Sequence, residues 1–109
     1  MVEQGDIIYL NFTPQSGHEQ VGKRPALVVS NNFFNSHNNM TMVCPITNFE
    51  PKTPLHVKID GTTKIHGTIL CDQVKCLDIK ARGYSDIEKL PDEILDEVLD
   101  IIQAIIEKQ

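Results

Sequence analysis

The chain has 109 residues, a hydrophobic fraction of 40% and a net charge of −5 at neutral pH. This length fits one domain with a single core, and no apolar run approaches the roughly 20 residues of a membrane span. We therefore expect a single domain over residues 1–109, located in the cytoplasm, with no signal peptide and no membrane contact. Eight acids and two lysines after residue 83 contribute −6, which leaves +1 for residues 1–83. The overall acidity therefore neither excludes nor favours a nucleic-acid ligand.

The first half of the chain predicts two strands and a short helix. Asp6 to Phe12 alternates as a strand does, and a long polar loop follows from Gln15 to Lys23. Arg24 to Ser30 is apolar on both faces, which indicates a central strand. Ser30 then caps a short helix, which ends at His37–Asn39.

Three further strands are expected in the middle of the chain. Met40 to Thr47 is the first, but Pro45 cannot donate to a ladder, which indicates an edge strand or a bulge. Leu55 to Asp60 alternates cleanly between a core face and a wet face. Gly67 to Leu77 reads as further strand, bent where Asp72 and Gln73 interrupt the apolar run.

The C-terminal part contains the strongest local prediction, an amphipathic helix from Pro91 to Lys108. Before it, Asp78 to Arg82 predicts one helical turn closed by Gly83, and Tyr84 to Lys89 is ambiguous. The broad apolar face of the helix suits either a core helix or, in part, a dimer surface. Together these elements predict a mainly β, α+β fold: a small antiparallel barrel with short helices and an amphipathic C-terminal helix.

The cysteines and histidines show no metal-site spacing. Cys44, Cys71 and Cys76 each lie in an apolar run, so we expect all three to be reduced, buried and inert. The four histidines lack zinc-site spacing. No metal and no cofactor are expected.

One stretch combines a fixed cation with a polar loop. Arg24 precedes Pro25, which favours extended backbone at the start of an apolar strand. The loop before it, Gly17 to Gly22, carries an imidazole, a carboxylate and an amide on His18, Glu19 and Gln20. These residues suit either a solvated surface loop or a site for an anionic ligand.

Five blocks in order resemble the MazF/PemK family of toxin endoribonucleases from bacterial type II toxin–antitoxin systems. The blocks are Gly5–Tyr9 with Asn11–Pro14, Gly17–Ser30, Cys44–Thr47, Cys71–Lys75 with Ala81–Arg82, and Leu90–Glu93. The resemblance implies an SH3-like barrel that works as a homodimer. It also implies a metal-independent, sequence-specific endoribonuclease that cleaves single-stranded mRNA and is neutralised by a cognate antitoxin.

The same resemblance assigns roles to individual residues. Arg24 and Thr47 match the catalytic arginine and threonine of the family, and both suit a phosphate chemically. Candidates for proton transfer are Glu19, Asp72 and His18. In one branch of the family an arginine two residues before the aspartate acts as the acid, but Leu70 occupies that position here. The departure puts the aspartate–arginine pairing in doubt for this chain.

Five other polar residues are expected to contact RNA rather than to take part in the chemistry: Gln20, Lys23, Gln73, Lys75 and Arg82. Two other functions remain open at this point. A related barrel could act as a non-enzymatic toxin that binds DNA gyrase, or as a plain SH3-like binding module. Retention of Arg24, Thr47 and the loop between Gly17 and Gly22 favours the nuclease.

Overall fold

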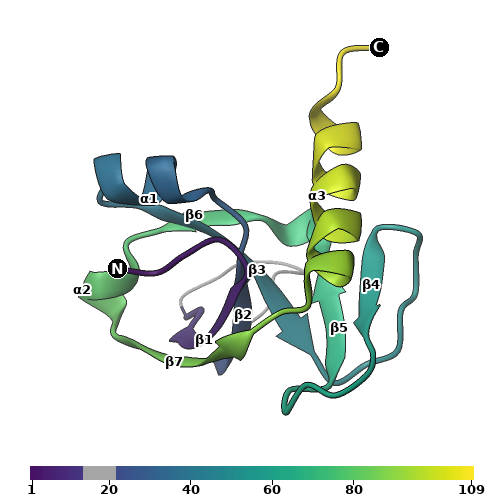
Figure 1. Cartoon of the computed structure of the whole chain (residues 1–109), viewed down its shortest axis with the longest axis horizontal. Coiled ribbons are helices and arrows are strands. Elements are labelled where there is room, and N and C mark those ends of the chain that lie inside the picture. The colour runs from purple at the N-terminus through teal and green to yellow at the C-terminus, as the bar shows by residue number, and fades with distance from the viewer. Residues whose placement is uncertain (14–21) are drawn as a thin grey trace.

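The computed structural model describes residues 1–13 and 22–109, and its strands form one antiparallel sheet (Figure 1). The strands are β1 (Asp6–Asn11), β2 (Lys23–Val28), β3 (Thr41–Thr47), β4 (His56–Ile59), β5 (Gly67–Leu70), β6 (Lys75–Leu77) and β7 (Tyr84–Lys89). The helices are α1 (Asn32–His37), the 3₁₀ turn η1 (Cys71–Gln73), α2 (Ile79–Arg82) and α3 (Asp92–Ile106). The sheet order is β4-β5-β3-β2-β1-β7, and β6 also pairs with β3.

The expected α+β class with a C-terminal helix is confirmed, but the barrel is not closed. The end strands β4 and β7 each pair with one neighbour among the described residues, β5 and β1 respectively. On one side β3 changes partner along its length, from β6 at Thr41–Val43 to β5 at Ile46–Thr47. This change of partner lets the sheet bend sharply and leaves its two end strands apart.

Of the two predictions for Pro45, an edge strand or a bulge, the edge strand is wrong. β3 lies inside the sheet, with β2 on one side and with β5 and β6 on the other. Pro45 sits where the partner on that second side changes, and neither it nor Cys44 is in register with β5 or β6. A residue without an N–H costs little where the ladder is already interrupted.

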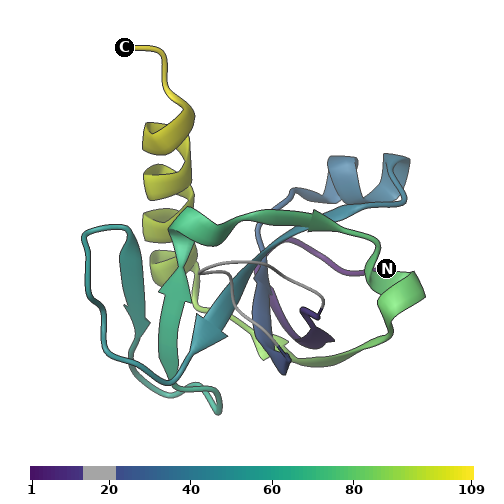
Figure 2. The same cartoon turned by 180° about the vertical axis from the view of Figure 1, so that it is seen from behind.

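Both faces of the central strands are buried, as the continuous apolar run of β2 predicted. Ile7, Leu27, Cys44 and Ile46 belong to one core cluster, which Leu95 and Val98 of α3 cover. Alternate residues of the same strands, Ile8, Leu10, Ala26, Val28 and Val43, form a second cluster. Val2, Phe12 and Ile79 of α2 complete it. α3 stands beside the β4–β5 end of the sheet, and α1 and α2 lie at the other end (Figures 1 and 2).

The helices agree with the sequence except for one cap. Asn31, not Ser30, caps α1, because the Asn31 side chain accepts a hydrogen bond from the Phe34 N–H. The Ser30 hydroxyl instead donates to Asn35 Oδ1 and accepts from the Met42 N–H, which ties α1 to β3. None of the helices among the described residues is long and apolar enough to cross a membrane.

The remaining local predictions hold with one exception. Asp78 caps α2, and Gly83 closes it at a φ of +80°. The ambiguous stretch Tyr84–Lys89 is a strand, because β1 offers it a partner. Cys44 and Cys71 are buried as expected, but Cys76 is exposed. Cys76 lies in β6, and among the described residues β6 pairs only with β3. The side chain of Cys76 therefore faces outward.

Candidate active site

One face of the sheet, the face that turns away from α3, carries polar side chains from three neighbouring strands. Val57, Ile59, Ile69 and Ile46 point into the core cluster that α3 covers. Because side chains alternate along a strand, their neighbours in sequence point to the opposite face. These neighbours include Thr47 of β3, His56 and Lys58 of β4, and Thr68 of β5.

Arg24 and Thr47 lie on this same face, at the same end of β2 and β3. Ala26 pairs with Pro45, Leu27 with Cys44 and Val28 with Val43. Arg24 precedes Ala26 by two residues and Thr47 follows Pro45 by two, so both share the face of the Ala26–Pro45 pair. The structure thus brings together the two residues that the sequence singled out first. Arg24 is half-buried, with its backbone paired to Leu10 of β1.

The hydroxyl of Thr47 is oriented by the chain that follows it. Thr47 is buried, and its Oγ1 accepts a hydrogen bond of 3.2 Å from the Phe49 N–H. A threonine hydroxyl also has one hydrogen to donate, and this contact leaves that hydrogen available. Thr47 lines a cavity of about 160 Å³ together with Phe49, Glu50, Lys52, His56, Leu70 and Gln73. A small polar group such as a phosphate oxygen has room to approach the hydroxyl there.

Asp72 is linked to this cavity through His56. The Oδ1 atom of Asp72 lies 3.3 Å from Nε2 of His56, and the two side chains are 37% and 13% exposed. Asp72 and Gln73 belong to η1, which bridges β5 and β6 where β3 changes partner. The expected interruption of the apolar run at Asp72–Gln73 is therefore confirmed, and it places one carboxylate and one amide beside the middle of β3, where the partner strand changes.

The charge of Asp72 is felt by two buried thiols. Burial, together with the smaller effects of the negative charges of Asp72 and Glu97, raises the pKa of Cys71 to about 12. Burial also raises the pKa of Cys44, with smaller contributions from Cys71 and Asp72. Both thiols therefore stay protonated at neutral pH and are poor nucleophiles.

Lys23 and Arg82 meet at a second depression, of about 280 Å³, which Tyr9, Asn11 and Tyr84 also line. Nη1 of Arg82 donates to the carbonyl oxygens of Asn11 and Thr13, at 3.0 and 2.9 Å. Arg82 therefore fixes the end of β1, whatever else it contacts. Lys23 is exposed at the start of β2.

The other predicted site residues divide into two groups. Gln73 lines the Thr47 cavity. Lys75, in β6, pairs with Val43 of β3. By the alternation of β6, Lys75 shares the face of Val43 and hence that of Arg24. His18, Glu19 and Gln20 lie outside the described residues.

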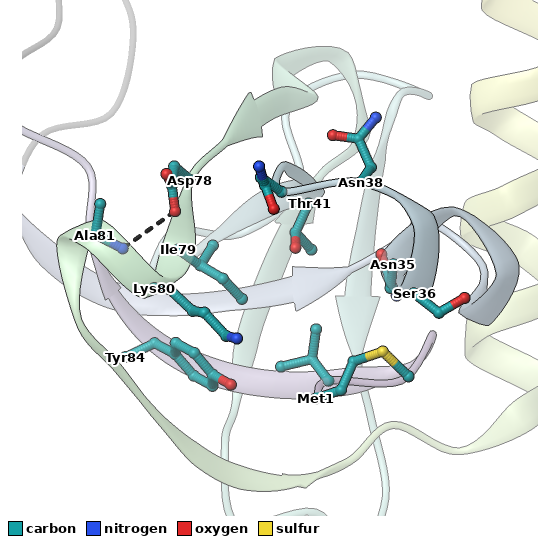
Figure 3. A pocket seen from close by; sticks show the side chains of 12 residues that line it. Met1, Asn35, Ser36, Asn38, Thr41, Asp78, Ile79, Lys80, Ala81 and Tyr84 are labelled. Atoms are coloured by element: carbon teal, nitrogen blue, oxygen red, sulfur yellow. Dashed lines mark hydrogen bonds between the residues drawn. The ribbon is translucent and has the colours of Figure 1, made fainter.

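A larger cavity lies elsewhere and contains none of the predicted site residues. It measures about 560 Å³ and is lined by residues of α1, α2 and the N-terminus (Figure 3). Asn35 and Asn38 face it from one side, and Lys80 and Tyr84 from the other (Figure 3). The Asp78 carboxylate beside it already accepts a hydrogen bond from the Ala81 N–H.

Sequence reasoning missed His56 and Lys52. The alternation of Leu55–Asp60 correctly placed His56 on the wet face, but nothing in it indicated a partner. The partner follows from the register of β4 and β5, in which His56 lies opposite Leu70, two residues before Asp72. Within the described part of the chain, no three His, Cys, Asp or Glu side chains cluster as metal ligands would.

Comparison with known proteins identifies the family. A sequence profile of the PemK-like, MazF-like toxins of type II toxin–antitoxin systems matches residues 3–106. The endoribonuclease toxin ChpB of Escherichia coli (strain K12) is 42% identical, with 96% of this chain and 94% of that protein covered.

Two solved structures of Deinococcus radiodurans MazF share the fold, and each is 33% identical over 95% of this chain and 94% of theirs. Their TM-scores are 0.88 for MazF and 0.82 for a MazE–MazF crystal. The matched region contains β2, the end of β3 and η1, and so includes Arg24, Thr47 and Asp72. The chain belongs to the PemK-like, MazF-like toxin family of type II toxin–antitoxin systems.

Proposed function

We propose that this chain is the toxin of a type II toxin–antitoxin system and a sequence-specific, metal-independent endoribonuclease that cleaves single-stranded mRNA in the cytoplasm. The family and the endoribonuclease activity named for its relative ChpB support this proposal. The observation that carries it is the placement of Arg24 and Thr47 on one face, at one end of β2 and β3. Beside them lies a cavity that also presents His56 and Gln73.

The substrate supplies the nucleophile. Both buried thiols have raised pKa values, so neither Cys44 nor Cys71 serves this role. RNA carries a 2′-hydroxyl next to each phosphodiester. Attack by its oxygen forms a new P–O2′ bond and breaks the P–O5′ bond, which yields a 2′,3′-cyclic phosphate and a 5′-hydroxyl. A proton leaves O2′, and a proton is delivered to O5′.

Each proposed catalytic residue has one task. Arg24 holds the phosphate through its planar guanidinium and stabilises the charge of the pentacovalent transition state. The Thr47 hydroxyl donates a hydrogen bond to a phosphate oxygen, since the Phe49 N–H already occupies one of its lone pairs. The Asp72 carboxylate is the described candidate for removing the O2′ proton.

The residues outside the described part of the chain retain the roles proposed from the sequence. Glu19 and His18 are alternative proton-transfer groups, and Gln20 is an RNA contact. Gln73, which lines the Thr47 cavity, and Lys75, which shares the face of Arg24, extend the RNA surface. Lys23 and Arg82 extend it past the start of β2.

A chimeric oligonucleotide tests the reaction. An RNA with one 2′-deoxy sugar at the scissile position should bind nearly as well as the all-RNA strand and remain uncut. Arg24→Ala should lower kcat by about 100-fold to 1000-fold, the usual cost of removing one charge-stabilising donor. Lys64→Ala, an exposed lysine in the β4–β5 loop, is the matched control and should cleave normally. Cleavage at the deoxy position would disprove the mechanism.

Metal independence has its own test. Cleavage should continue in excess EDTA, because a cation, a hydroxyl and a carboxylate suffice for attack by the 2′-hydroxyl. Loss of cleavage in EDTA, with recovery on addition of zinc or magnesium, would refute this part of the proposal.

An antitoxin and a second copy of the chain are the proposed protein partners. The Deinococcus MazE–MazF crystal supports an antitoxin partner. We expect the antitoxin to carry a disordered acidic segment that folds on binding. This segment covers the positive charges on the proposed RNA-binding face, above all those of Arg24 and Lys75. Antitoxin should then compete with the uncleavable deoxy strand for binding. Simultaneous binding of antitoxin and the deoxy strand would refute this mode of inhibition.

We expect the chain to act as a homodimer.

A further inference from the structure

His56 connects three parts of the candidate site. Its Nε2 atom faces Oδ1 of Asp72 at 3.3 Å, and its Nδ1 atom accepts a hydrogen bond of 3.3 Å from the Lys52 N–H. The ring itself lines the cavity that contains Thr47 and Gln73. One side chain of β4 thus joins η1, the loop after β3 and the cavity wall.

These contacts define the protonation of the ring. Nδ1 accepts from the Lys52 N–H, so it carries no hydrogen in this arrangement. The ring hydrogen is then on Nε2, which donates toward Asp72. Because both ring nitrogens are engaged, His56 is poorly placed to exchange a proton with a substrate directly. It is well placed to hold a carboxylate that does.

We propose that His56 is a positioning residue, which holds the Asp72 carboxylate at the cavity beside Thr47 and Gln73 for removal of the 2′-hydroxyl proton. This inference rests on the proposed endoribonuclease function. Asp72 lies on a short 3₁₀ turn and is more exposed than His56. Without a partner its carboxylate can take up other rotamers, whereas the half-buried imidazole is kept in place by the wall of the cavity and by Lys52.

The contact between His56 and Asp72 needs no charge on the ring, because the neutral imidazole with its hydrogen on Nε2 already donates to the carboxylate. Other charged side chains at this cavity are those of Lys52 and Glu50, which line it. Glu97 of α3 acts on Cys71, the residue before Asp72. Lys58 is engaged with Glu50, 3.1 Å away.

Two substitutions separate the contacts of His56. In His56→Gln the terminal amide reaches the position of Nε2 and still donates to Asp72, but the acceptor for Lys52 is lost. In His56→Asn the shorter amide reaches only the position of Nδ1, so it accepts from Lys52 and loses Asp72. Exposed His66→Gln is the matched control. All four proteins are assayed on the cleavable RNA and on the 2′-deoxy strand.

Positioning predicts a split between kcat and binding. His56→Asn should lower kcat by about 10-fold to 100-fold, less than the full contribution of a general base, and leave affinity for the deoxy strand unchanged. His56→Gln should stay within about threefold of wild type near neutral pH, because its side-chain amide still donates to Asp72. A purely structural role would lower the unfolding midpoint of both variants and lower kcat only in proportion to the loss of folded protein.

The outcomes distinguish this inference from the proposed function. If wild type does not cut the RNA, the proposed function fails and the inference fails with it. If wild type cuts and His56→Asn cuts equally well, only the role of His56 is wrong. Should His56→Asn fail to fold, ¹⁵N NMR of the imidazole in wild type and Asp72→Asn decides. Ring-nitrogen shifts that ignore the Asp72 substitution would overturn the proposal.

Discussion

The backbone of Gly67 lies so close to the carbonyl oxygen of Thr47 that a Cβ atom at Gly67 would fall well inside van der Waals contact. Gly67 also has a φ of +135°, a conformation that other residues rarely adopt. The next residue, Thr68, pairs with Thr47, and its hydroxyl donates to the Phe49 carbonyl. Gly67 therefore sets how closely β5 approaches the end of β3 that carries the Thr47 hydroxyl.

Gly67→Ala should destabilise the fold and displace Thr47. We expect the free energy of unfolding to fall by more than about 2 kcal/mol, from backbone strain and steric contact together, as urea unfolding would measure. RNA cleavage should fall further than the loss of folded protein explains. Gly61→Ala is the control, because Gly61 has a φ of +108° but no atom within 4 Å of its Cβ position. Its loss should be about 1–2 kcal/mol, the cost of strain alone. Equal losses in the two variants would contradict a role for the Thr47 contact.

Arg82→Met should cost stability even without RNA. The guanidinium donates to the carbonyls of Asn11 and Thr13, and its loss leaves the end of β1 unsecured. We expect urea unfolding to report a loss of about 1.5–3 kcal/mol, the range for hydrogen bonds to a charged group. Lys80→Met, on the exposed side of the same helical turn, should change stability by less than about 0.5 kcal/mol. Unchanged stability in Arg82→Met would leave RNA contact as the remaining role for Arg82.

The three thiols should react at very different rates in the native protein. Burial and nearby negative charge raise the pKa of Cys71 to about 12, and burial raises the pKa of Cys44 as well, whereas Cys76 is exposed. A thiol reagent at mildly alkaline pH should label one cysteine per chain quickly and all three only in denaturant. Cys76→Ser should abolish the fast reaction. Rapid labelling of two or more native thiols would contradict the buried positions of Cys44 and Cys71.

Local patterns predicted most elements of this fold because their causes are local. The apolar stripe of α3, the cap and closing glycine of α2, and the alternation of β4 each depend on a few neighbouring residues. The prediction of an edge strand at Pro45 failed for the opposite reason. Whether a missing N–H matters depends on which strands lie alongside, and β3 exchanges β6 for β5 at that point.

The site was predictable only in part. Arg24 and Thr47 could be selected from the family motif and from their chemistry, and the register of β2 and β3 brings them to one face. His56 could not be selected, since its contact with Asp72 depends on the pairing of β4 with β5. Cys76 was misassigned because an apolar run does not reveal which of its side chains meets a neighbour.

Lys89 should contribute a small, pH-dependent stabilisation. Its Nζ atom lies 2.9 Å from Oδ1 of Asp6 and 3.1 Å from Oε1 of Glu3, and the hydrogen bond to Asp6 is the main cause that raises the pKa of Lys89. A raised folded pKa means that this stabilisation is complete below the ordinary value of 10.5 and is lost as the pH rises through the folded value. Because Lys89 is exposed, Lys89→Met should cost less than about 1 kcal/mol at neutral pH. The difference between variant and wild type should vanish in strongly alkaline urea titrations. A difference that grows with pH would show that the lysine acts through packing instead.

The last turn of α3 should form part of the contact between two copies of the chain. Leu95 and Val98, in the first half of the helix, are buried, whereas Ile105 and Ile106 are 47% and 77% exposed. Apolar side chains exposed at a helix end suit an interface between identical chains. Sedimentation at micromolar concentration should give about twice the monomer mass of 12.3 kDa.

Ile106→Glu should shift this equilibrium toward the monomer without unfolding the chain, because Ile106 lies outside both core clusters. Gln103→Glu adds the same charge at another exposed position of the helix and should leave the dimer intact. Far-UV circular dichroism of both variants checks that the fold is retained. A monomeric wild type would disprove the homodimer. A dimeric Ile106→Glu would place the interface on another surface, and the large cavity between α1 and α2 would be the next region to test.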